Sequence, residues 1–72
     1  MNTLMHMVCL AEGAEVAGDD ELVRGLEHVI FMIIERKHGG QWLADHIQDC
    51  LDNRADPVQC WDLLGLRLGK IK

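Results

Sequence analysis

One histidine and two cysteines in the second half of the chain are of types that could do chemistry. His46 and Cys50 are four residues apart, which places both on one face of a helix, and Cys60 follows ten residues later. Imidazole and thiolate are ligands that zinc prefers, so these three residues form a candidate metal site, with His38 as a further ligand. The chain lacks CxxC, HxxxH and HExxH motifs, so a buried histidine beside a small cysteine is the favoured interpretation.

The same residues could also pair as a cysteine nucleophile and a histidine base. The chain has no serine and no tyrosine, and Thr3 is its one threonine, so covalent catalysis would have to use a cysteine. No glycine motif typical of an oxyanion hole is present, and a chain of 72 residues is short for a deep catalytic pocket. We therefore expect a protein that is not an enzyme and that has no cofactor.

Soft donor side chains gather near the N-terminus. This cluster contains Met1, Met5, His6, Met7 and Cys9. Thioether and thiol groups suit Cu(I), but methionines also fill irregular gaps in small cores. Because no spaced ligand motif supports copper, core packing is the favoured interpretation.

Four carboxylates follow one another at spacings of four, three and four residues: Asp45, Asp49, Asp52 and Asp56. The first three would form an acidic ridge along the exposed side of a helix. Such a ridge could dock a basic protein surface or imitate the spacing of phosphates. It could equally be a solvated face that keeps an apolar protein in solution, which is the more common case. We retain Asp45, Asp49 and Asp52 as candidate partner-binding residues.

Helices must position all of these side chains, because apolar residues recur every three or four positions in four segments. Asp19 and Asp56 are suited to cap helices, Gly39 and Gly40 to end one, and Pro57 to occupy a first helical position. The expected helices cover residues 3–17, 20–38, 41–54 and 57–68. The sequence therefore predicts an all-α fold, a compact bundle of about four short helices in a single domain spanning residues 1–72.

The second predicted helix contains the longest apolar run, residues 22–34, and should form the centre of the core. On a helical wheel its broad core face contains Leu22, Val23, Leu26, Val29, Ile30, Ile33 and Ile34. Phe31 falls on the polar side of the wheel, and Met32 falls at the edge of the core face. An aromatic residue there indicates an anchor for a partner, unless a fourth helix covers both sides of this one. The two interpretations are evenly matched, and Phe31 and Met32 are candidate partner-binding residues.

The composition indicates a small protein that assembles with another molecule. The chain is 49% hydrophobic, and one of this length buries only ~60% of its unfolded surface, which favours a homodimer or a bound partner. Arg24, Glu27 and His28 interrupt the apolar run, which is also shorter than the ~20 residues of a membrane span. An odd number of cysteines without a signal peptide predicts a reduced, cytoplasmic protein.

The first functional expectation is a non-enzymatic protein–protein interaction module, such as a small regulator, adaptor or inhibitor of the phage or mobile-element type. Its partner would be a second copy of the chain or another protein with a basic surface. One alternative is a metal-binding or metal-sensing domain. Another is a DNA-associated regulator whose basic tail, Arg67, Lys70 and Lys72, contacts phosphate. A net charge of −5 argues against direct nucleic-acid binding.

Overall fold

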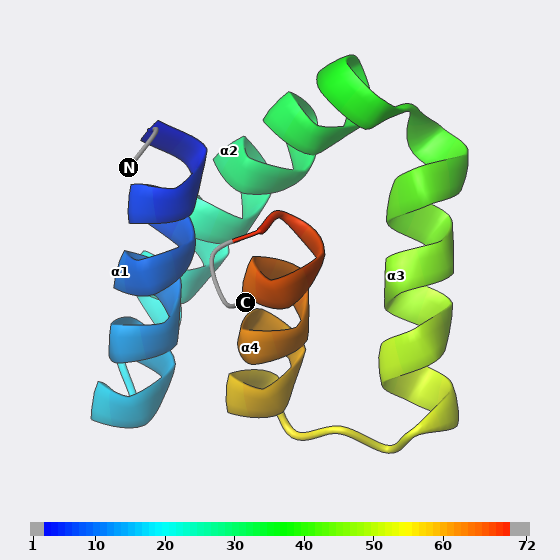
Figure 1. Ribbon diagram of the computed structural model, residues 1–72. Coiled ribbons are helices and arrows are strands. Elements are labelled where there is room, and N and C mark those ends of the chain that lie inside the picture. Colours follow the sequence, from blue (N-terminus) through cyan, green and yellow to red (C-terminus); the bar gives the residue numbers. More distant parts are fainter. Residues whose placement is uncertain (1–2, 70–72) are drawn as a thin grey trace.

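Four helices make up the fold in the computed structural model, which describes residues 3–69 (Figure 1). The predicted all-α helical bundle is confirmed, and the described residues contain no strand. The third helix begins one residue earlier and ends two residues earlier than expected, and the fourth ends one residue earlier. The helices are α1 (Thr3–Ala17), α2 (Asp20–His38), α3 (Gly40–Asp52) and α4 (Pro57–Arg67).

Local signals in the sequence explain where the helices begin and end. The Asp19 carboxylate accepts a hydrogen bond from the backbone N–H of Leu22, 3.2 Å away, at the start of α2. Gly39 has a φ of +92°, a conformation that side chains disfavour, and it separates α2 from α3. At α4, Asp56 accepts from the backbone N–H of Gln59 at 2.8 Å, and the Gln59 side chain accepts in return from the backbone of Asp56.

The core is formed mainly by α1, α2 and α4. Val8, Ile30, Ile34 and Leu64 are fully buried and belong to one apolar cluster. The closest helix packing is between α1 and α2, between α1 and α4, and between α2 and α3. Figure 1 shows α3 standing apart from α1 and α4, joined to α2 by the Gly39 turn and to α4 by the loop that follows Asn53. Consequently α3 is covered on one side only.

The buried face of α2 is narrower than the face that the helical wheel predicts. Leu22 and Val29 were expected in the core, but they are 47% and 41% exposed. Val23, Ile30 and Ile34, which the wheel also places on this face, are buried as expected. The centre of burial is shifted toward the side of Phe31 because α3 and α4 approach α2 from there.

A helical wheel does not show which neighbours cover a face, and other helices show the same effect. On α1, Met5 is buried, in agreement with core packing, whereas Leu10 is 47% exposed although it is equally apolar. On α3, Ile47 and Leu51 are 40% and 67% exposed although they are apolar. Within the described residues, none of the helices combines the length and apolar character needed to cross a membrane.

The cap of α4 can be tested by replacing Asp56 with alanine. We expect Asp56→Ala to lower the free energy of unfolding by about 1 kcal/mol, because the backbone N–H of Gln59 loses its acceptor. Urea unfolding followed by far-UV circular dichroism measures this loss. Asp62→Ala is the matched control, since Asp62 is exposed within α4 and its removal changes the charge equally. Equal losses in the two variants would contradict the role of the cap.

Candidate functional site

An apolar groove lies between α3 and α4. Its volume is about 480 Å³, and Phe31 and Trp61 lie at its floor. Ile47 and Leu51 of α3 form one wall, and they are exposed although their side chains are apolar. The remaining lining residues are Glu15, Glu27, His46, Cys50, Ala55, Pro57 and Cys60. We call this hollow the α3–α4 groove.

Aromatic stacking fixes how α3 leaves α2. The Trp42 ring is stacked between two histidines, with centroids 5.0 Å from His38 and 6.3 Å from His46. His38 is the last residue of α2, so this stack spans the turn at Gly39. Arg67, the last residue of α4, forms an ion pair with Asp49 of α3 and also lies near His46. Helices α3 and α4 are thus joined by side chains and do not pack closely through their backbones.

His46 and Cys50 meet inside the groove, as their spacing predicts. The Cys50 sulfur lies 3.7 Å from Nε2 of His46, and both residues are buried. Burial, together with the neighbouring Cys60 thiol that hydrogen-bonds with it, raises the pKa of the Cys50 thiol to about 12. Burial also lowers the pKa of His46, as does the positive charge of Arg67. Both groups are therefore held neutral, and Cys50 lacks the thiolate form that a cysteine nucleophile requires.

The metal interpretations gain no geometric support. Cys60 does lie beside Cys50, but within residues 3–69 no three His, Cys, Asp or Glu side chains are arranged so that they could hold a metal ion. All three cysteines are free thiols. In the N-terminal cluster of soft donors, Met5 is buried in the core and Met1 lies outside the described residues. Among residues 3–69, His46, Cys50 and Cys60 therefore do not form a preorganised site.

The acidic ridge is largely occupied by local interactions. Asp45 accepts a hydrogen bond from Gln41 at 2.9 Å, and Asp52 accepts one from Gln48 at 2.8 Å. Asp49 is paired with Arg67. The ridge therefore consists of partnered carboxylates on the exposed side of α3, where their charge still contributes to the field around the groove.

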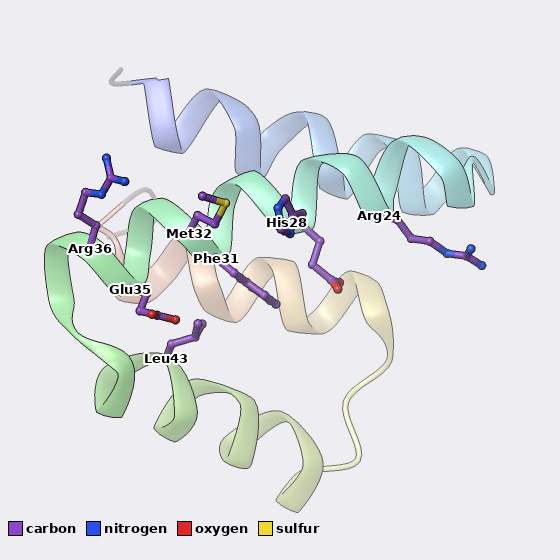
Figure 2. A pocket seen from close by; sticks show the side chains of 8 residues that line it. Arg24, His28, Phe31, Met32, Glu35, Arg36 and Leu43 are labelled. Atoms are coloured by element: carbon purple, nitrogen blue, oxygen red, sulfur yellow. The ribbon is translucent and has the colours of Figure 1, made fainter.

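The ion pair of Arg67 also bears on the DNA-binding alternative, because the charge of this residue of the proposed basic tail is paired with Asp49. The other two, Lys70 and Lys72, lie outside the described residues. The remaining cations of the described residues include Arg24 and Arg36, which line a trough between α2 and α3 together with Glu27 and Glu35 (Figure 2). Mixed charges of this kind do not select one class of charged ligand.

Phe31 and Met32, the candidate partner-binding residues of α2, both line the trough between α2 and α3, but they differ in exposure. Phe31 is half-buried against the core, and its ring centroid is 6.2 Å from that of Trp61. The interpretation in which another helix covers this side of α2 therefore holds for Phe31. Met32 is 51% exposed, and in Figure 2 its side chain points away from that of Phe31.

Two features of the groove were not predicted as site residues. The sequence places Ile47 and Leu51 on one side of their helix with the other apolar residues, and Glu27 on the polar side of the wheel. The i, i+4 spacing of Ile47 and Leu51 identifies a shared face, but nothing in the sequence indicates that this face remains uncovered.

Comparisons with models of known protein families, with curated proteins and with solved structures found no match.

The buried histidine makes stability depend on pH. An unfolded histidine takes up a proton near pH 6.5, whereas folded His46 does so only at lower pH. Below pH 6.5 the unfolded state thus binds more protons, and the free energy of unfolding falls by up to about 1.4 kcal/mol per pH unit. Urea unfolding at about pH 7.5 and about pH 5.5 measures this slope, because these two pH values bracket the range in which histidine titrates.

We expect His46→Leu to reduce the pH slope. This variant should remain folded, because Nδ1 of His46 is buried with no hydrogen-bond partner among residues 3–69, and Cys50, which contacts Nε2, keeps its hydrogen bond with Cys60. His28→Leu is the control, since His28 is exposed on α2. If both variants kept the slope of the original protein, burial of His46 would not be its source.

Proposed function

We propose that this chain is a small protein-interaction module that binds an amphipathic, basic helix of a partner protein in the α3–α4 groove. The observation that carries the proposal is the exposure of Ile47 and Leu51 above an aromatic floor of Phe31 and Trp61. Burying such apolar surface contributes about 25 cal/mol per Å². A partner that covers the groove therefore gains binding energy from residues that the chain itself leaves in water.

The shape of the groove favours a helical occupant. Its walls are two helices, and the longer wall, α3, has 13 residues. The part of α3 that lines the groove, from His46 to Leu51, corresponds to about 8 Å of helix, enough to face one to two turns of a bound helix. Helices bind in such grooves through apolar residues at positions i, i+3, i+4 and i+7.

The charge of the groove favours a basic occupant. Glu15 and Glu27 are among its lining residues, which include no lysine and no arginine. The chain as a whole has a net charge of −5, and Asp45 and Asp52 add negative charge beside the α3 wall. Lysine or arginine flanking the apolar face of the partner helix would meet these carboxylates, which would speed association and set its orientation.

A module of this kind acts by contact, as a regulator, adaptor or inhibitor. It would bind a helix through which the partner contacts another molecule and so block that contact, or it would bring the partner to a second protein. We place it in the cytoplasm, where free thiols such as those of Cys9, Cys50 and Cys60 remain reduced.

The proposal is tested with a synthetic amphipathic helix built of leucine and lysine as the probe. We expect Leu51→Glu to weaken its binding at least about tenfold, because the variant places a charge in the apolar wall. Isothermal titration calorimetry gives the affinity, and chemical shifts of the Trp61 indole report contact with the groove floor.

Leu66→Glu is the matched control. Leu66 is 49% exposed on α4 and lies outside the groove, and its replacement changes hydrophobicity and charge equally. Equal binding by the two variants would overturn the proposal, because attraction would then be purely electrostatic. The proposal would also be overturned if the groove bound a small apolar dye but not the helical probe, because the groove would then be a small-molecule site.

A further inference from the structure

The outer face of α2 contains an apolar line that the described fold does not cover. Leu22, Val29 and Met32 are 47%, 41% and 51% exposed. With Gly25 they follow at spacings of three, four and three residues, so they lie along one side of the helix. The residues that α2 buries, Val23, Ile30 and Ile34, lie on a different face. We call this line the outer stripe of α2.

Gly25 has no role within the described fold. It lies in the interior of α2, where glycine costs roughly 0.5–1 kcal/mol relative to alanine. Its φ is not positive, and a Cβ atom placed there would meet nothing within 4 Å. Neither backbone geometry nor internal packing therefore requires glycine, whereas close approach by another molecule would.

Charged residues extend the outer stripe at both ends. Glu21 precedes Gly25 by four residues, and Arg36 follows Met32 by four residues. Both are exposed, and neither forms an ion pair within residues 3–69. The four residues lie on one helix face that spans about 22 Å.

This spacing is symmetric about the midpoint between Gly25 and Met32. An antiparallel second copy of α2 centred there has Arg36 opposite Glu21 and Met32 opposite Gly25. The first match joins opposite charges, and the second places a long side chain against a residue without one. A parallel copy would instead place Glu21 against Glu21 and Arg36 against Arg36. Antiparallel helix dipoles favour the same orientation.

The surface is hollowed where the second copy would insert its methionine. A depression of about 440 Å³ is lined by Asp19, Glu21, Leu22, Gly25 and Leu26. Met32 extends outward from α2 in Figure 2, on the same side as Arg36. We infer that two copies of this chain associate antiparallel through the outer stripe of α2, with Met32 of each copy seated at Gly25 of the other and Glu21 facing Arg36.

This dimer does not rest on the proposed function, and it leaves the α3–α4 groove open. Phe31, at the groove floor, lies on a different face of α2 from the outer stripe. The dimer presents two grooves, so a partner with two suitable helices would bind with an avidity beyond that of one groove.

Charge reversal tests the orientation. Sedimentation equilibrium should find a dimer for the original chain, and Glu21→Arg or Arg36→Glu alone should each raise the dissociation constant about tenfold, because like charges then meet at both ends. An equimolar mixture of the two variants should restore the original affinity, since every contact in the mixed pair again joins opposite charges. Both variants oppose the dipole of α2, so rescue by mixing cannot arise from helix stability. A chain that stays monomeric at every concentration, or a mixture no tighter than the single variants, would overturn the inference.

Gly25→Gln tests the seat of the methionine, with Gly13→Gln as the matched control. Both glycines lie inside helices, and a Cβ at either position would meet open space. Both variants should therefore raise helix stability, whereas only Gly25→Gln should weaken the dimer, at least about tenfold. Equal dimer affinities for the two variants would contradict the predicted contact. Leu51→Glu should leave the dimer intact, because Leu51 lies in the groove. If this variant were monomeric, the dimer interface would be the groove and not the outer stripe.

Discussion

The burial of Ile30 and Ile34 against residues of α1 and α4 is the interaction on which the rest of the structure depends. Both isoleucines are fully buried, and Val8 of α1 and Leu64 of α4 belong to the same cluster. Full burial of one such side chain stabilises the fold by about 1.5–3 kcal/mol, and a chain of 72 residues has few of them. The rotation of α2 about its axis is therefore set by these contacts. That rotation turns Phe31 toward Trp61 and leaves the outer stripe in solvent.

The one-sided packing of α3 follows from the same constraint. Since α1 and α4 occupy the centre of the core, α3 packs on α2 alone and meets α4 through side chains. The stack of His38, Trp42 and His46 orients it, and the Asp49–Arg67 ion pair holds its far end. The α3–α4 groove is the space that this arrangement leaves. Polar groups inside it are kept neutral by burial, which suits the binding of an apolar surface better than reactive chemistry.

Some charged residues of the chain stabilise the fold, and others lie beside exposed apolar surfaces where they can contact a partner. Asp19 and Asp56 cap helices, while Asp45, Asp49 and Asp52 bond to neighbours on α3 or α4. Glu15 and Glu27 border the groove, and Glu21 and Arg36 border the outer stripe. Each apolar surface that the fold leaves exposed therefore has charged residues beside it, and these determine which partner fits.

The sequence by itself determined the helices, because the signals for them are local. Aspartate caps, glycine stops and apolar spacing act within a few residues, and they placed the helix ends to within about two residues, the usual scatter of such boundaries. They also brought His46 and Cys50 together, since an i, i+4 pair needs only a helix.

The tertiary structure decided which part of each apolar face is covered. Leu22 and Val29 are as apolar as Ile30, and only the positions of α1, α3 and α4 make them differ in exposure. Phe31 meets Trp61 across thirty residues of sequence, and Leu51 stays exposed because no helix packs over it. These outcomes depend on how whole helices pack against one another, and periodicity within a single helix contains no information about its neighbours.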